Sequence, residues 1–116
     1  FYQDVLGMEV STVHDSPRGR HVFVKPGLTT TWGFHFFEMV DTPSPDPETL
    51  RTISFAPTLH FAIAIANEAA ALRLRETLLT HGIAVTDINT MGPVRNILFR
   101  DNNGLLLEAA WSAGEG

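Results

Sequence analysis

The sequence predicts an α+β fold made of two similar modules within one domain, and three observations support this prediction. First, a chain of 116 residues with 44% hydrophobic and 18% charged residues is typical of one folded domain. Second, each half shows a helix end and a glycine, followed by three strand-like segments. Third, a proline-dense stretch separates the halves. We therefore expect module one at 1–41, a linker at 42–57, module two at 58–111 and a tail at 112–116.

Charge and composition exclude several classes of protein. The formal net charge is −5 and the eight basic residues are scattered, so the basic patch of a nucleic-acid binder is missing. The chain has no cysteine, so any metal site must use nitrogen and oxygen ligands. No apolar stretch reaches the roughly 20 residues of a membrane helix, and no signal segment opens the chain. We expect a cytoplasmic protein without nucleic-acid or membrane partners.

The elements of module one begin with a helix end. Residues 1–6 are followed by Gly7, and glycine most easily takes the left-handed conformation that closes a helix. Residues 8–13 alternate as a strand does, and 21–24 and 34–40 are the next strand candidates.

The linker is predicted from its prolines. Four of the seven prolines lie within residues 42–57. Proline lacks the backbone donor that a central strand needs, so this stretch is expected to form a crossover connection between the modules.

Module two shows the same order with a complete strand and helix at its start. Residues 59–66 predict a strand, Asn67 is a good N-cap for a helix to about Thr80, and Gly82 provides the stop. Three more strands are expected at 83–86, 95–99 and 105–110. Asn103-Gly104 predicts a tight hairpin turn between the last two.

The two halves match at similar offsets. Gly7 and Gly82 are 75 residues apart, and Glu38 and Glu108 are 70 apart. His60 lies 22 residues before Gly82, so its counterpart in module one would precede Phe1. We therefore expect the first strand and most of the first helix of module one to be absent from this chain.

Two segments resemble the vicinal oxygen chelate superfamily, the glyoxalase/bleomycin resistance protein/dioxygenase-like domains. Residues 1–10 are similar to its helix-to-strand segment, and residues 94–108 to its final hairpin, with Asn102 where proline is usual. The resemblance implies two βαβββ modules that form an open, cupped sheet around a cavity. It also implies that metal ligands come from equivalent strands of the two modules.

By position, the resemblance assigns His60, Glu108 and Glu38 as ligands of a divalent metal ion (Fe, Mn, Ni, Zn or Mg). A fourth ligand would lie on the absent first strand. In such a site a ligand carboxylate, here Glu108 or Glu38, can double as the catalytic base. His35, in the same strand as Glu38, is a competing candidate.

The surroundings of His60 and Glu108 leave alternatives open. His60 shares a strand face with three alanines, which leave volume for a cavity wall (Ala62, Ala64 and Ala66). The alternative is a histidine that only forms a hydrogen bond near a strand end. Glu108 follows three leucines, so its carboxylate must be paired, metal-bound or at a rim, because burying it alone costs several kcal/mol.

The remaining histidines and aromatic residues carry no clear site. We expect His14 in a loop, His21 on a strand face and His81 at a helix end. The aromatic residues of the third strand region are expected to be core more than pocket lining (Trp32, Phe34, Phe36 and Phe37).

Two functions follow from the resemblance. One is a divalent-metal-dependent enzyme, a lyase or isomerase or an extradiol-dioxygenase-like oxidoreductase, on a small oxygenated substrate. The other is a metal-free protein that binds a small molecule or antibiotic, as bleomycin resistance proteins do. A fragment without activity is a third possibility. The resemblance also implies a homodimer.

Overall fold

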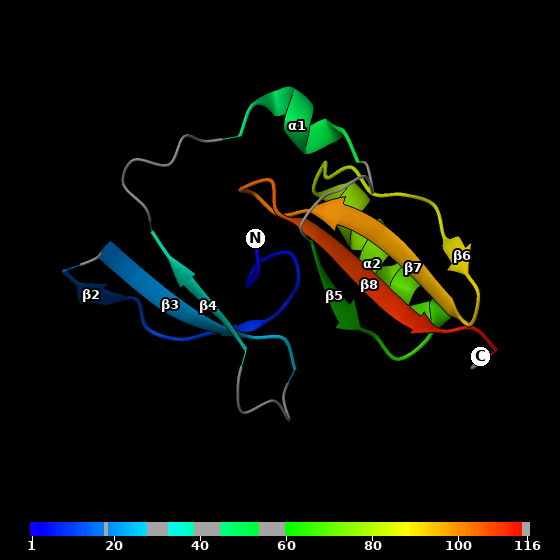
Figure 1. Cartoon of the computed structure of the whole chain (residues 1–116), viewed down its shortest axis with the longest axis horizontal. Coiled ribbons are helices and arrows are strands. Elements are labelled where there is room, and N and C mark those ends of the chain that lie inside the picture. Colours follow the sequence, from blue (N-terminus) through cyan, green and yellow to red (C-terminus); the bar gives the residue numbers. More distant parts are fainter. Residues whose placement is uncertain (18, 28–32, 39–44, 54–59, 115–116) are drawn as a thin grey trace. The chain divides into compact units, whose positions relative to one another are not determined.

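The computed structural model describes residues 1–17, 19–27, 33–38, 45–53 and 60–114 (Figure 1). The chain forms two compact units, Phe1–Ser44 and Pro45–Gly116. Each unit contains one four-stranded sheet.

The first unit opens with a helical turn, as predicted for residues 1–6. The Val5 amide donates to the Phe1 carbonyl at 2.9 Å, and the Gly7 amide donates to the Gln3 carbonyl at 3.2 Å. Gly7 has a φ of 69° and directs the chain into the first strand.

The sheet of the first unit is built around one long strand. Its strands are β1 (Glu9–Val10), β2 (His14–Ser16), β3 (Gly19–Lys25) and β4 (Phe34–Phe37). The other three strands all pair with β3 in antiparallel fashion, and β1 and β2 pair with its opposite ends. The strand expected at 8–13 is shorter because the Ser11 hydroxyl, in place of a backbone carbonyl, accepts the Phe23 amide at 3.0 Å. The prediction that His14 lies in a loop was wrong, since it pairs with His21 across the β2–β3 hairpin.

The two faces of this sheet differ. On one face Tyr2 packs on Phe34 and Phe36, with ring centroids 6.1 and 4.7 Å away, beside the buried Val24. The other face carries rings in mutual contact (His14, His21, Phe23, His35 and Phe37). Phe37 is 48% exposed, so the expectation that it belongs to the core was wrong, while Trp32 and residues 39–40 lie outside the described residues.

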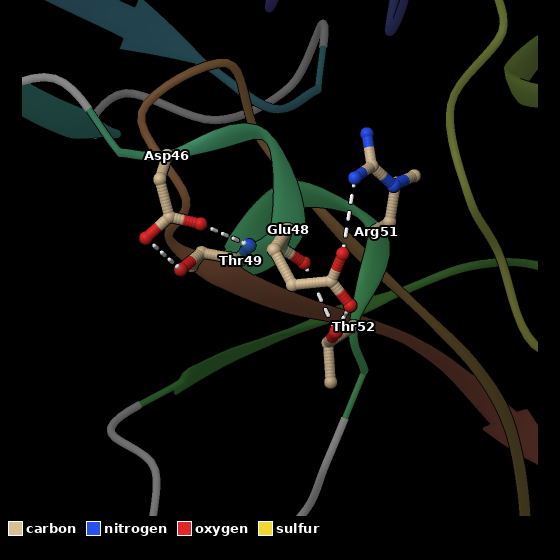
Figure 2. A network of polar contacts seen from close by, with 5 residues as sticks. All are labelled: Asp46, Glu48, Thr49, Arg51 and Thr52. Atoms are coloured by element: carbon tan, nitrogen blue, oxygen red, sulfur yellow. Dashed lines mark hydrogen bonds and ion pairs between the residues drawn. The ribbon is translucent and has the colours of Figure 1, made fainter.

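A short helix stands within the stretch predicted as linker. Helix α1 (Pro47–Arg51) has Asp46 as its N-cap, and the Asp46 carboxylate accepts the Thr49 amide at 2.8 Å and the Thr49 hydroxyl at 3.1 Å (Figure 2). At the other end Thr52 caps the helix by donating its hydroxyl to the Glu48 carbonyl at 2.9 Å. Proline fits the first helical turn because no backbone donor is needed there, so the prolines permit a helix that the sequence pattern did not predict.

The second unit has the predicted βαβββ order. Its elements after α1 are β5 (His60–Ala64), α2 (Glu68–Thr80), β6 (Asn89–Met91), β7 (Val94–Arg100) and β8 (Leu106–Ser112). The sheet order is β5-β8-β7-β6, with β5 parallel to β8 and the other pairs antiparallel.

Helix α2 begins and ends where the sequence predicts. The Asn67 side chain accepts the Ala70 amide at 3.0 Å, which is the expected N-cap. At the other end Gly82 has a φ of 73°, and the Ile83 amide reaches back to the Leu78 carbonyl at 2.9 Å. This is the glycine-dependent helix end called a Schellman motif.

The prediction of a strand at 83–86 was wrong. Only Val85 forms an isolated bridge, to Phe99, and the next strand along the chain is β6. The Thr86 amide donates to the Leu98 carbonyl at 3.0 Å, but the return bond from the Leu98 amide goes to the Thr86 hydroxyl at 3.0 Å. A side chain thus takes the place of the backbone acceptor, and the ladder does not continue.

The β7–β8 hairpin has a longer turn than Asn103-Gly104 alone predicts. The Asp101 amide donates to the Leu105 carbonyl at 2.9 Å, and the Gly104 amide donates to the Asp101 carbonyl at 3.1 Å. Gly104 has a φ of 85°, whereas no described residue other than glycine has a positive φ. The loop is therefore the three-residue type with a left-handed glycine at its end. The buried Asp101 carboxylate also accepts the Asn103 and Leu105 amides, each at 2.8 Å.

Part of the core of the second unit lies between its sheet and α2, while Leu98 and Leu106 are buried on the opposite face of the sheet. Ala71 and Leu78 of α2 are fully buried, as are Ile97 of β7 and Leu107 of β8. Figure 1 shows α2 lying along one face of β7 and β8. The Arg95 guanidinium donates to the Glu68 carboxylate at the start of α2 at 2.7 Å, which assigns this face to the odd-numbered residues of β7.

Candidate functional site

The candidate site lies on the face of the second sheet that points away from α2. Ala62, Glu108 and Leu98 are partners across β5, β8 and β7, and paired residues share a face. Side chains alternate along a strand, so His60 and Asn96 point to this same face.

His60 and Glu108 come together, as the resemblance implies. His60 Nε2 lies 3.2 Å from Glu108 Oε2. The His60 side chain keeps 30% of its surface exposed and that of Glu108 keeps 13%. The parallel pairing of β5 with β8 produces this contact, because it sets Ala62 directly opposite Glu108 and leaves His60 one step along the same face. Ala62 and Ala64 are exposed on this face.

Asn96 is part of this site and was not predicted from the sequence. Its Nδ2 donates to Glu108 Oε1 at 2.7 Å and to the Met91 sulfur at 3.4 Å. Asn96 is fully buried. The available signal was an amide directly before the apolar run at 97–99, but its partner depended on the strand register.

Glu38 lies in the first unit, just after β4. Its amide donates to the Arg20 carbonyl at 2.8 Å, and its carboxylate accepts Arg20 Nε at 2.9 Å. The Glu38 side chain is 51% exposed. The hydrogen bond between the Arg20 guanidinium and the Glu38 carboxylate, and then the negative charge of Glu38, raise the pKa of Arg20 above its ordinary value. Strand alternation puts Glu38 on the face of Phe36, whereas its competitor His35 lies on the opposite face, stacked on Phe23 with ring centroids 4.0 Å apart.

The pair fits a divalent cation in chemistry and spacing. Imidazole nitrogen and carboxylate oxygen are suitable ligands for first-row metals. Two ligand atoms, each about 2.1 Å from one ion, lie roughly 3.0–3.4 Å apart for octahedral to tetrahedral angles. The 3.2 Å between His60 Nε2 and Glu108 Oε2 falls in this range. Within the described part of the chain, however, no group of three or more His, Asp or Glu side chains forms a metal cluster.

Comparison with known proteins identifies the fold. No family model matches the sequence. No curated protein matches it either. Solved structures do match: a glyoxylase/bleomycin resistance protein/dioxygenase domain from Frankia sp. EAN1pec has a TM-score of 0.72 at 18% identity, covering 96% of this chain and 83% of that one.

Two further structures come from differently named proteins. A genomically encoded fosfomycin resistance protein from Listeria monocytogenes has a TM-score of 0.63 at 18% identity, covering 98% of this chain and 80% of that one. A lactoylglutathione lyase from Agrobacterium tumefaciens has a TM-score of 0.63 at 22% identity, covering 95% of this chain and 79% of that one. The chain therefore has the glyoxalase/bleomycin resistance/dioxygenase fold, and the predicted resemblance to the vicinal oxygen chelate superfamily is confirmed at the level of fold.

None of the described helices is long and apolar enough to cross a membrane.

Proposed function

We propose that this chain is a divalent-metal-dependent enzyme acting on a small oxygenated substrate, of the lyase, isomerase or extradiol-dioxygenase type. The observation that carries the proposal is the 3.2 Å approach of His60 Nε2 to Glu108 Oε2 on a sheet face not covered by α2. Proteins with the same fold include one named as a lyase and one named for a dioxygenase domain.

In this proposal His60 and Glu108 hold the metal ion, and Glu38 is a ligand only by its position in the sequence. A bound divalent ion would polarise the oxygen atoms of the substrate. His60 would bind through Nε2, and Glu108 through Oε2, since Asn96 occupies Oε1. Glu108 or Glu38 would also serve as the base that accepts a proton from the substrate. For Glu38 this role requires that its carboxylate leave Arg20.

A metal-free binding protein is the second candidate, and one observation favours it. His60 and Glu108 already bond to each other, so both can be satisfied without an ion. In that case the pair would recognise a polar group of a bound small molecule, as a bleomycin-resistance-like protein would.

Metal binding separates the two candidates. We expect the chain to bind Mn²⁺, Ni²⁺ or Zn²⁺ in calorimetric titrations, and His60→Ala and Glu108→Gln each to lose more than about 100-fold in affinity, beyond the usual loss for an outer-shell change. Glu38→Gln should lose less affinity, since the Glu38 carboxylate is 51% exposed and already bonded to Arg20.

Matched controls are available on the surface. His81 is exposed at the end of α2 and Glu48 is exposed in α1, so His81→Ala and Glu48→Gln should bind the metal as the wild type does. Equal metal affinity in wild type, His60→Ala and Glu108→Gln would refute the enzyme proposal, and a wild type that binds no metal would favour the metal-free candidate.

We also propose that the chain forms a homodimer. Leu72 and Leu79, seven residues apart on α2, lie on one helix face and are 50% and 49% exposed, so they offer two apolar side chains to a second copy of the chain. Light scattering after size exclusion should give twice the chain mass; a mass of 12.8 kDa at all concentrations would contradict this.

A further inference from the structure

We propose that Asn96 is a positioning residue that fixes the Glu108 carboxylate through Oε1, so that Glu108 presents a single oxygen, Oε2, to His60 and to a bound ion. The part about the ion rests on the proposed function. The part about Glu108 does not, because it concerns the metal-free chain.

The contact between Asn96 and Glu108 is short and shielded. Asn96 Nδ2 lies 2.7 Å from Glu108 Oε1, a separation typical of an amide donating to a charged acceptor. Asn96 is fully buried, and the Glu108 side chain is 13% exposed. A hydrogen bond to a charged group in such surroundings is stronger than one at the surface, since water does not compete for it.

The strand register brings the two side chains together. Asn96 is directly opposite Ala110, and Glu108 is one step along the same face of β8. Because Ala110 has no atoms beyond Cβ, the Asn96 amide has room to lean toward Glu108. Larger side chains at position 110 would fill this space.

The orientation of the amide follows from the charge of its neighbour. If Asn96 were rotated by 180°, its oxygen would face Glu108 Oε1, and two acceptors would meet without a hydrogen between them. With Nδ2 toward Glu108, its second hydrogen is available to the Met91 sulfur, which lies 3.4 Å from Nδ2.

The same orientation of the Asn96 amide destabilises the folded state in a way that an apolar residue at position 96 would avoid. Asn96 Oδ1 is buried and has no hydrogen-bond partner among the described residues. An unsatisfied buried acceptor destabilises the folded state, so an apolar residue of the same shape would be better if the position only had to be filled. The bond to Glu108 is the favourable interaction that offsets this cost.

The consequence is a carboxylate with two distinct oxygens. Oε1 is taken by Asn96 and Oε2 faces His60, at 2.7 and 3.2 Å. Loss of the amide would let the carboxylate rotate and offer either oxygen, or both, to an ion.

A double-mutant cycle in the metal-free chain tests the first part. The variants are Asn96→Leu, Glu108→Leu and the double variant, with Asn96→Ala made alongside in case the larger side chain prevents folding. We expect the two positions to be coupled by about 10- to 100-fold in the unfolding equilibrium constant, the range of a hydrogen bond to a charged group. Coupling below about 2-fold would overturn the proposal.

Metal binding and infrared spectroscopy test the second part. Asn96→Leu should lower Mn²⁺ affinity about 10- to 100-fold. The carboxylate bands that vanish in Glu108→Gln should show a wide separation of the two stretches in wild type, typical of one-oxygen binding, and a narrower one in Asn96→Leu. Met91→Leu is the control, because Met91 contacts Asn96 but is 52% exposed and forms no hydrogen bond to Glu108 among the described contacts.

The outcomes separate this inference from the proposed function. If wild type binds no metal, the proposed function fails, and the cycle alone decides the role of Asn96. If wild type binds Mn²⁺ and Asn96→Leu has the same affinity and the same bands, the single-oxygen assignment is wrong.

Discussion

Removal of the Asp101 carboxylate should destabilise the second unit more than its loop position suggests. Asp101 is 2% exposed, and its Oδ1 accepts the Asn103 and Leu105 amides at 2.8 Å each. Each hydrogen bond to a charged group contributes about 1.5–3 kcal/mol. Part of this is recovered when water reaches the loop, so we expect Asp101→Ala to lower the free energy of unfolding by about 2–4 kcal/mol.

Urea denaturation followed by circular dichroism measures this change. Asp101→Asn keeps an acceptor oxygen but loses the charge, so its loss should be about half as large. Asn102→Ala is the control, since Asn102 is exposed in the same loop and should stay within about 0.5 kcal/mol of wild type. A loss below about 0.5 kcal/mol in Asp101→Ala, with an unchanged denaturant slope, would refute the view that this carboxylate holds the hairpin turn.

Three further predictions concern the helices. Leu78→Ala should lower the free energy of unfolding by about 3–5 kcal/mol, because the side chain is fully buried; a loss under 1 kcal/mol would contradict this packing. Asn67→Ala should lower the free energy of unfolding by about 1 kcal/mol and Asn67→Gly by only a few tenths, measured in the same way. Equal losses in the two variants would argue against Asn67 as the N-cap of α2. Hydrogen bonds from the amide and then the hydroxyl of Thr49 hold the pKa of Asp46 below its ordinary value, so this N-cap stabilises the fold above the unfolded pKa of Asp46 and is lost as pH falls through the folded value. In NMR titrations Thr49→Val should move the Asp46 midpoint upward but only part of the way, since the backbone donor remains; an unchanged midpoint would show that the hydroxyl bond has no effect.

Much of the second unit could be predicted because its signals are local. The N-cap Asn67 and the stop at Gly82 act within one helical turn of the residues they satisfy, so both ends of α2 follow from the sequence. The same holds for Gly7, whose φ of 69° matches the 73° of Gly82. Strands β7 and β8 were predicted to within two residues at each end.

Short strands and side-chain acceptors that replace backbone carbonyls were harder to predict. Residues 83–86 have the composition of a strand, but a hydroxyl from Thr86 replaces the backbone bond that would extend the ladder. His14 sits in a strand of three residues, too short for alternation to indicate it. The sequence placed Glu38 at a family ligand position. That Arg20 is its partner could not be predicted, because it follows from the pairing of β3 with β4.

The sequence by itself determined the βαβββ order of the second unit, the ends of α2, and His60 and Glu108 as the residues to examine. Only the tertiary structure decided which side chains share a face. A two-residue turn at Asn103-Gly104 would pair Phe99 with Glu108 and turn Asn96 to the opposite face. The observed three-residue turn pairs Leu98 with Glu108 instead. Because side chains alternate with a period of two, this single residue in the loop places Asn96 beside the carboxylate.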